Sequence, residues 1–272
     1  MMRALWSAAS GMISQQTNVD TISNNISNVN TTGFKTEQAE FKSLLYQTIQ
    51  TRTTTANGAT KPISAQVGLG TRLASITSTF TQGSMLASES PTSFAIEGAG
   101  FFGVMAEDGT TRYTRNGNFL WGIGSNGTTL ATTSGNPVLD SNGNPIVLPG
   151  NIRATEVQFM PGTGELAYLD GGKTLRSLGI TIGTWQFDNR AGLEKVGGSQ
   201  FKETVSSGAA MNEATTNNLT RSKVQNKFLE GSNVQVADEM VDLIVAQRAY
   251  EMNSKAIQAA DDMLGQANSL RR

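Results

Sequence analysis

The chain has 272 residues, a formal net charge of −1 at pH 7, and neither Cys nor His. Without Cys it can form no disulfide, thiolate nucleophile or thiolate-bound zinc site. Without His it lacks the usual general base and the commonest metal ligand. The near-zero charge provides no basic surface for nucleic acid or a membrane, and no run of about 18 apolar residues could span a bilayer. We therefore expect no enzymatic activity, no cofactor, no metal site, no nucleic-acid partner and no membrane insertion.

The surface is expected to be polar but poorly charged. Charged residues make up 16% of the chain, well below the roughly 25% usual in soluble domains, and Thr, Ser, Asn and Gln make up the difference. Such a surface is poorly protected against self-association, which is expected where other protein covers it. The length allows one to three domains.

Residues 4–30 are predicted to form one amphipathic helix. Large apolar side chains recur every seven residues and others fill the alternate positions: Leu5, Met12, Val19 and Ile26, with Ala8, Gln15, Ile22 and Val29 between them. Asp20 is the only charge between Ala4 and Phe34, and the remaining faces carry Ser, Thr, Asn and Gln. Because Asn and Ser compete for backbone hydrogen bonds, this helix needs packing on more than one side. Gly33 is suited to the left-handed position that ends a helix.

Two segments follow whose patterns are weaker. Residues 34–50 hold five large apolar side chains and could form either a short helix or an extended arm: Phe34, Phe41, Leu44, Leu45 and Ile49. Residues 51–66 are rich in Thr and contain Asn57-Gly58, a favoured hairpin turn, so they predict a loop or an extended hairpin.

From about Val67 to Lys227 a two-residue periodicity with frequent Gly predicts antiparallel strands in an all-β sandwich or barrel-like domain. The expected strands are 72–80, 93–97, 101–105, 111–114, 118–121, 128–132, 145–148, 155–160, 165–169, 178–187 and 199–204. Hairpin turns are expected at Asp108-Gly109, Asn116-Gly117, Asn126-Gly127, Asn142-Gly143 and Asp170-Gly171. Residues 206–220 are expected to be a connector that leaves this domain.

A second helix is predicted from Ser232-Asn233 onward, with Ser232 and Gln235 as a capping box and early acidic residues near the positive helix end. Its heptad residues alternate between large and small: Val236, Leu243, Tyr250, Ile257 and Leu264, with Ala246, Asn253, Ala260 and Ala267 between them. Sustained seven-residue spacing is typical of a coiled coil. We therefore expect the two terminal helices to pair along this seam and their amide-rich faces to bind other copies of the chain.

Two segments match ligand-binding motifs but lack the context that those motifs need. Gly98–Gly103 fits the dinucleotide fingerprint, but a strand and a hairpin turn follow it where a helix is required. Asp140–Pro145 resembles the start of a calcium loop but has Pro145 where Gly is needed, so it predicts a turn.

Several segments resemble the bacterial flagellar rod and hook family. Ser23–Lys35 (SNNISNVNTTGFK) is similar to its Asn-rich N-terminal signature, and Leu229–Ile257 is similar to its C-terminal signature. Phe80–Met85, Ala95–Val104, Asp108–Phe119 and Gly135–Leu139 resemble its shared β-domain. The signature residues carried over are Asn24, Asn25, Asn28, Gly33, Phe34, Gly231, Asn233, Gln247, Arg248 and Tyr250. Distal rod proteins resemble the chain most, because they share its start (MMRALWSAASGM) and an inserted arm corresponding to Tyr46–Arg72.

The resemblance implies an α+β multidomain structural subunit. Terminal coiled-coil helices (1–30 plus 232–272), an extended arm (31–70 plus about 206–231) and an outer, mainly antiparallel β-domain (71–205) are expected. It further implies type III export without a cleaved signal, and assembly in the periplasm into a helical homopolymer that transmits motor torque to the hook and forms part of the export channel. Implied partners are proximal rod subunits, hook subunits, surrounding ring proteins and the export apparatus.

Two alternatives remain. The chain could be a proximal rod or hook subunit of the same family, or a secreted β-rich enzyme or adhesin whose terminal helices merely close a monomer.

Overall fold

The computed structural model describes residues 2–50, 65–124, 127–150, 152–160, 165–170, 174–216 and 219–270. These residues form two compact units. A helical unit comprises Met1–Ser27, Glu37–Ser78 and Gln235–Arg272, and a β unit comprises Asn28–Thr36 and Thr79–Val234. The chain is α+β, as expected, and the β unit is built from antiparallel pairs. The division into three parts stays a prediction.

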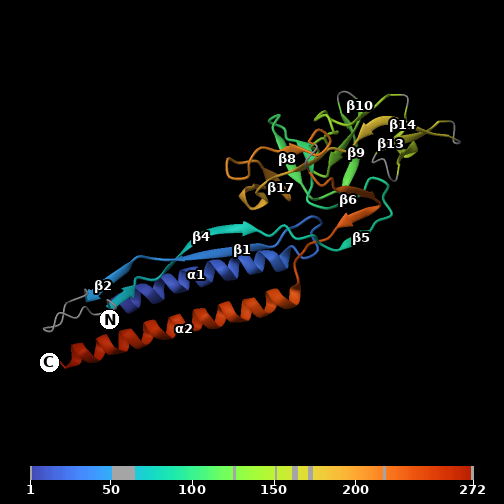
Figure 1. The fold of residues 1–272 in the computed structure, drawn as a ribbon. Coiled ribbons are helices and arrows are strands. Elements are labelled where there is room, and N and C mark those ends of the chain that lie inside the picture. The colour runs from blue at the N-terminus through green and yellow to red at the C-terminus, as the bar shows by residue number, and fades with distance from the viewer. Residues whose placement is uncertain are drawn as a thin grey trace. The chain divides into compact units, whose positions relative to one another are not determined.

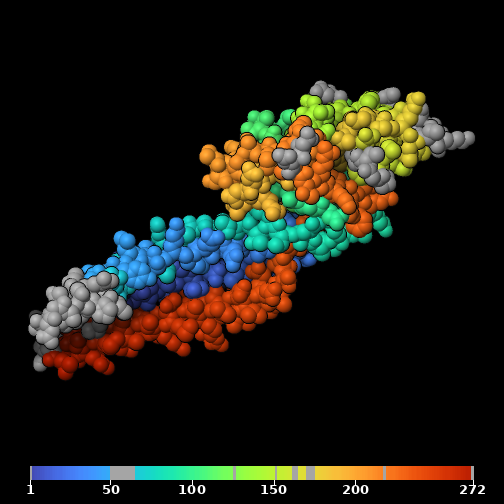
Figure 2. Space-filling model, viewed as in Figure 1, coloured from blue at the N-terminus to red at the C-terminus, as the bar shows by residue number. Residues whose placement is uncertain are grey.

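Two long helices dominate the helical unit. Helix α1 (Met2–Ser27) and helix α2 (Val236–Ser269) run antiparallel and side by side, so that both chain ends lie at the same end of this unit (Figure 1). In the space-filling view α2 lies directly against α1 (Figure 2).

Both helices are shorter at one end than predicted. Helix α1 ends at Ser27, before Gly33, which does adopt a left-handed backbone (φ +69°) but in a later turn. The predicted capping box is wrong, because α2 begins after Gln235 without a side-chain cap, and the Ser232 hydroxyl accepts from the Val234 amide instead.

A long antiparallel β ribbon completes the helical unit. Strand β1 (Glu37–Ser43) pairs with β4 (Thr71–Ser78), and β2 (Tyr46–Gln50) pairs with β3 (Ala65–Gly68). The segment 34–50 is therefore extended rather than helical. The predicted Asn57-Gly58 turn lies outside the described residues.

The β unit contains a six-stranded sheet, a pair of three-stranded sheets and two strand pairs. The six-stranded sheet has the order β16 (Glu194–Gly197), β17 (Gln200–Lys202), β8 (Thr111–Thr114), β7 (Phe101–Met105), β15 (Thr184–Gln186), β18 (Met211–Asn212). The three-stranded sheets are β11 (Val147–Leu148), β10 (Gly127–Thr132), β9 (Phe119–Gly124) and β12 (Val157–Phe159), β13 (Glu165–Asp170), β14 (Thr174–Thr181). The strand pairs are β19 (Lys223–Asn226) with β6 (Phe94–Glu97) and β20 (Phe228–Glu230) with β5 (Met85–Ala87).

Two hydrophobic clusters hold the β unit together. The larger contains Phe94, Ile96, Phe102, Phe119 and Leu130, all almost fully buried. The smaller is aromatic and centres on Phe101, Tyr113, Trp185, Phe187 and Phe201, which meet edge to face. Strand β7 is buried on both faces, because the consecutive Phe101 and Phe102 point into the two different clusters, whereas in β9 the buried Phe119 is followed by the exposed Leu120.

Every predicted strand from 72 to 204 overlaps an observed one, but two expectations were wrong. The predicted strand 178–187 is two strands in different sheets, since β14 ends at Thr181 and β15 begins at Thr184; a Cβ at Gly183 between them would lie 2.4 Å from the Asp140 carbonyl oxygen. Asn116-Gly117 is no hairpin turn, because the strands on its two sides, β8 and β9, do not pair.

The expected connector 206–220 is instead part of the β unit: β18 pairs with β15, and Glu213 is buried.

The segments Gly98–Gly103 and Asp140–Pro145, which match ligand motifs in sequence, form a strand bend and a turn. Gly98 (φ +132°) and Gly103 lie at the bend between β6 and β7 and within β7, and a Cβ at Gly103 would lie 2.3 Å from the Trp185 ring. Asp140 accepts backbone hydrogen bonds from Asn142 and Asn144, both 2.8 Å, so Asp140–Pro145 is a turn closed by its own carboxylate.

Candidate assembly surfaces

The face of α2 that is most buried is its row of small residues. Ala246 and Ala260 are almost fully buried, and Asn253 lies midway between them. A Cβ added to Gly11 of α1 would lie 2.9 Å from the Asn253 side-chain nitrogen, so the helices approach closely at this point. Small side chains on both helices permit this approach.

The predicted seam residues occupy several environments. Ile22 is buried, and the half-buried ones flank the close contact: Leu5, Met12, Val19, Ile26, Leu243, Ile257 and Leu264. Val236 and Tyr250 are 41% and 42% exposed. Val29 follows the end of α1 and belongs to the β unit, so it cannot extend the helix stripe. The pairing of the remaining seam residues as a coiled coil stays a prediction.

Part of the polar face of α1 is covered by the chain's own ribbon. The Ser14 and Thr71 hydroxyls are 3.1 Å apart, and the Ser10 hydroxyl accepts from the Thr71 amide. Ser14 is buried. The expectation that the amide and hydroxyl face binds other copies is therefore wrong for these residues, because β4 already satisfies them.

Asn25 connects three elements of the helical unit. Its side-chain oxygen accepts from the Glu37 amide (2.9 Å), and its nitrogen donates to the Glu37 carbonyl (2.8 Å) and to the Glu239 carboxylate (3.2 Å). Asn25 is only 1% exposed. Burial raises the pKa of Glu239, and Asp242 and Asp238 on the same helix raise it further, whereas the hydrogen bond from Asn25 lowers it. One amide thus joins α1, β1 and the first turn of α2.

The outer side of α2 carries large apolar side chains without cover in the single chain. They are Met240, Val241, Ile244, Val245, Met252 and Met263. At about 100° per residue, Met240, Val241 and Ile244 lie on the side of the helix opposite Ala246, Asn253 and Ala260, whereas Val245, Met252 and Met263 lie about a quarter turn from that row. Helix α2 therefore has two apolar sides, and only one of them is covered by α1.

The N-terminal signature reaches into the β unit directly after α1. The Gly33 amide donates to the Glu230 carbonyl (2.8 Å), and a Cβ at Gly33 would lie 2.5 Å from the Asn116 backbone nitrogen. Phe34 is buried under the Lys195 ammonium group, 4.5 Å from its ring centre. Gly33 therefore has a conformational and a steric reason to be glycine.

A buried cluster of charged side chains holds the N-terminal signature segment in place. Glu230, fully buried, accepts from Lys35 Nζ (2.6 Å) and Arg115 (3.2 Å), and Lys35 also donates to the Thr81 carbonyl. Burial lowers the pKa of Lys35 and of Arg115, whereas the neighbouring Glu230 raises both. The cluster links β20, the residue directly after β8 and the segment 28–36, so residues far apart in the chain hold one another in place.

The other signature residues make close contacts or hydrogen bonds with neighbouring segments, or are exposed. Gly231 lies against Gly83, where a Cβ would lie 2.1 Å from the Gly231 carbonyl oxygen, and Asn233 bridges three segments of the β unit. Asn24 donates to Glu37, and Asn28 accepts from Thr31. On α2, Gln247 and Arg248 are exposed, and Arg248 pairs with Glu251.

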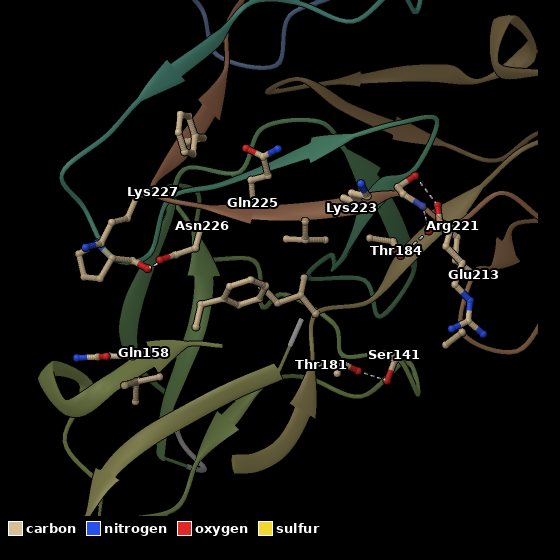
Figure 3. A pocket seen from close by; sticks show the side chains of 18 of the residues that line it. Ser141, Gln158, Thr181, Thr184, Glu213, Arg221, Lys223, Gln225, Asn226 and Lys227 are labelled. Carbon is tan, nitrogen blue, oxygen red and sulfur yellow. Dashed lines mark hydrogen bonds between the residues drawn. The ribbon is translucent and has the colours of Figure 1, made fainter. Parts of the chain in front are cut away.

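The β unit also has a groove of about 1140 Å³ between β19 and the sheet of β12 to β14 (Figure 3). Several polar groups at the groove are hydrogen-bonded within the protein: the Glu213 carboxylate accepts from Thr184, Gln186 and Ser222, and Thr181 donates to Ser141. No cluster of possible metal ligands occurs among the described residues. Neither of the two described helices is long and apolar enough to cross a membrane.

Comparisons with known proteins match both ends and the middle. Residues 5–35 match the family described as flagella basal body rod protein, residues 95–165 the flagellar hook protein FlgE/F/G D1 domain, and residues 225–270 the flagellar basal body rod FlgEFG protein C-terminal. The chain is 45% identical over 273 residues to the flagellar basal-body rod protein FlgG of Borreliella burgdorferi, covering all of both chains. The FlgG protein of Agrobacterium fabrum is 40% identical over 96% of this chain and 97% of its own, and that of Bacillus subtilis is 36% identical over the full length of both. The chain belongs to the FlgG family of flagellar basal-body rod proteins.

As a FlgG-family protein, the chain is a structural subunit of the flagellar rod in the basal body, and it assembles with other rod and hook components. Two of the three family matches coincide with the surfaces described above. Residues 5–35 contain most of α1 and the segment 28–35 that belongs to the β unit, and residues 225–270 contain Glu230, Asn233 and α2.

Sequence reasoning missed Lys35, Arg115, Glu230 and Glu239 as organising residues. Single charged residues carry no periodic signal, and the partners of Glu230 and Glu239 lie 195 and 214 residues away. The only available signal was position, because Lys35, Glu230 and Glu239 all lie within the two terminal signature segments.

Proposed function

We propose that this FlgG-family chain is the distal rod subunit and that it polymerises into a helical tube. In that tube α1 and α2 pair as a coiled coil, and the seam residues together with the outer side of α2 bury against neighbouring copies. The ribbon formed by residues 37–50 and 65–78 bridges neighbours as an arm. The tube transmits motor torque to the hook and encloses part of the export channel.

The carrying observation is the uncovered apolar side of α2. Ile244 and Val245 are 55% and 61% exposed, next to further exposed Val and Met side chains. Fully burying one such side chain stabilises by about 1.5–3 kcal/mol, so a row of them on one helix side favours a permanent protein partner. A second copy of the chain is the partner that a rod of identical subunits supplies.

Export and location follow from the same proposal. The subunit leaves the cytoplasm through the type III apparatus without a cleaved signal peptide and assembles in the periplasm. There it contacts proximal rod subunits below, hook subunits above and the surrounding ring proteins. The absence of Cys from the sequence suits a chain that is exported unfolded.

The test is a pair of charge substitutions on the uncovered side. Ile244→Asp with Val245→Asp is expected to abolish polymer in sedimentation and electron microscopy, because buried unpaired carboxylates cost several kcal/mol. The monomer should keep its helical circular dichroism, since both positions face solvent in the single chain. Ile244→Leu with Val245→Ile changes the same two positions but keeps them apolar, and this control should still polymerise. Normal polymer from the Ile244/Val245 variant would refute the proposal.

A further inference from the structure

Three of the four chain segments that pass between the two units are joined at one side chain. The chain enters the β unit at Asn28, leaves it after Thr36, returns to it at Thr79 and leaves it again after Val234, and the last three of these crossings are the joined ones. Asn233 lies beside the last of these crossings, and all of its contacts described below are within the β unit.

Asn233 uses its whole hydrogen-bonding capacity. Its side-chain oxygen accepts from the Thr36 amide and the Thr36 hydroxyl, both 2.8 Å. Its side-chain nitrogen donates to the Thr79 carbonyl (2.9 Å) and to the Thr81 hydroxyl (2.7 Å). A primary amide has two donors and one oxygen with two acceptor sites, and here each is occupied.

The backbone reinforces the same junction. The Thr79 amide donates to the Thr36 carbonyl (2.8 Å), so two crossing segments are bonded directly as well as through Asn233. Nearby, Lys35 donates to the Thr81 carbonyl and pairs with Glu230, three residues before Asn233. The chain segments at Thr36, Thr79 and Asn233 are therefore hydrogen-bonded to one another and do not behave as three independent linkers.

We propose that Asn233 is the positioning residue that makes these segments act as one attachment, and that it thereby sets the bending stiffness of the rod. This inference rests on the proposed function as a torque-transmitting polymer. Load that reaches one crossing segment is shared with the other two through the Asn233 amide. Without the amide, each segment would flex separately.

Asn233→Ala and Asn233→Asp test the inference at two levels. Alanine removes every hydrogen bond of the side chain, whereas aspartate keeps an acceptor for Thr36 and sets an oxygen against the Thr79 carbonyl. Asn212→Ala is the matched control, because the Asn212 amide also bridges two segments of the β unit (to the Ser141 carbonyl, 2.7 Å) but touches no crossing. In Asn233→Ala, hydrogen exchange of the Thr36 amide should be roughly 2- to 10-fold faster, the equivalent of one lost hydrogen bond.

The deciding measurement is the persistence length of polymers of the full-length chain, taken from electron micrographs. Both Asn233 variants should polymerise with a shorter persistence length, while Asn212→Ala matches the unmodified chain. Unchanged stiffness in both Asn233 variants would overturn the inference and leave the proposed function intact. Failure of both to polymerise while Asn212→Ala does would also overturn it, because Asn233 would then serve folding alone. If the unmodified chain forms no polymer, the proposed function itself fails.

Discussion

At the scale of single residues, buried carboxylates organise this rod protein. Glu230 and Glu239 are buried, and each joins segments that are far apart in the chain. Their negative charges have different partners: Glu230 has two cationic partners, whereas Glu239 has the neutral Asn25 amide. A buried carboxylate without a cation prefers its protonated form, which makes Glu239 the residue to test by pH.

Glu239→Gln should stabilise the helical unit at neutral pH. Because the folded-state pKa of Glu239 is raised above its ordinary value of 4.5, the folded state binds the proton more tightly than the unfolded state does. The unmodified chain therefore gains stability as the pH falls through the folded-state pKa. Gln can still accept from Asn25, so the advantage of the variant should shrink on acidification and be lost below the ordinary value.

The measurement is the urea midpoint of helical circular dichroism at neutral and acidic pH. Glu251→Gln is the control, because Glu251 lies on the same helix with its side chain about half exposed. An advantage of Glu239→Gln that does not change with pH would contradict the raised pKa.

At the scale of elements, α2 is organised by small residues on one side and large apolar residues on the other. The side toward α1 has Ala246, Asn253 and Ala260, which let Gly11 approach. The heptad pattern predicts that a seam exists, but large and small residues share the same spacing, so the pattern does not determine which row lies at its centre.

Gly11→Ala and Asn253→Ala should be coupled. Replacing a helix-interior Gly by Ala stabilises by about 0.5–1 kcal/mol, but the new Cβ would lie 2.9 Å from the Asn253 side chain, which must move. Gly11→Ala alone should therefore be close to neutral, and its gain should appear only in the Asn253→Ala background.

A double-mutant cycle in urea, followed by helical circular dichroism, measures this coupling, which we expect to be about 0.5–1 kcal/mol. Gly265→Ala is the control for helix propensity alone, since a Cβ there meets nothing within 4 Å. Strict additivity of the two substitutions would mean that the helices do not meet closely at Gly11.

At the scale of the whole molecule, the β unit depends on a segment from the N-terminal end of the chain. Residues 28–36 belong to the β unit although the segments on both sides belong to the helical unit. They supply the buried Phe34 and the Lys35 partner of Glu230. The β unit therefore takes part of its stability from both terminal signatures.

A chain that lacks residues 1–27 should keep a stable β unit, whereas one that lacks residues 1–36 should lose about 3–5 kcal/mol, the usual cost of breaking a buried ion pair. Urea unfolding followed by tryptophan fluorescence measures this, because Trp185 lies in the aromatic cluster of the β unit and Trp6 is absent from both truncated chains. Equal urea midpoints would show that the 28–36 segment adds no stability.

Local sequence patterns predict the kinds of elements, the antiparallel β class, a strand and a turn at the two motif matches, and the family. Periodicity and turn residues are local, so they record which sides of a helix or strand are apolar. What covers each side follows from the fold. In the folded chain α1 ends at Ser27, and residues 28–36 belong to the β unit. Ser14 and Asn25 have hydrogen-bond partners in the chain's own ribbon. The large apolar side chains on the outer side of α2 are exposed. The physical reason is that a buried polar group takes whichever partner the fold brings near, and that partner can stand anywhere in the chain.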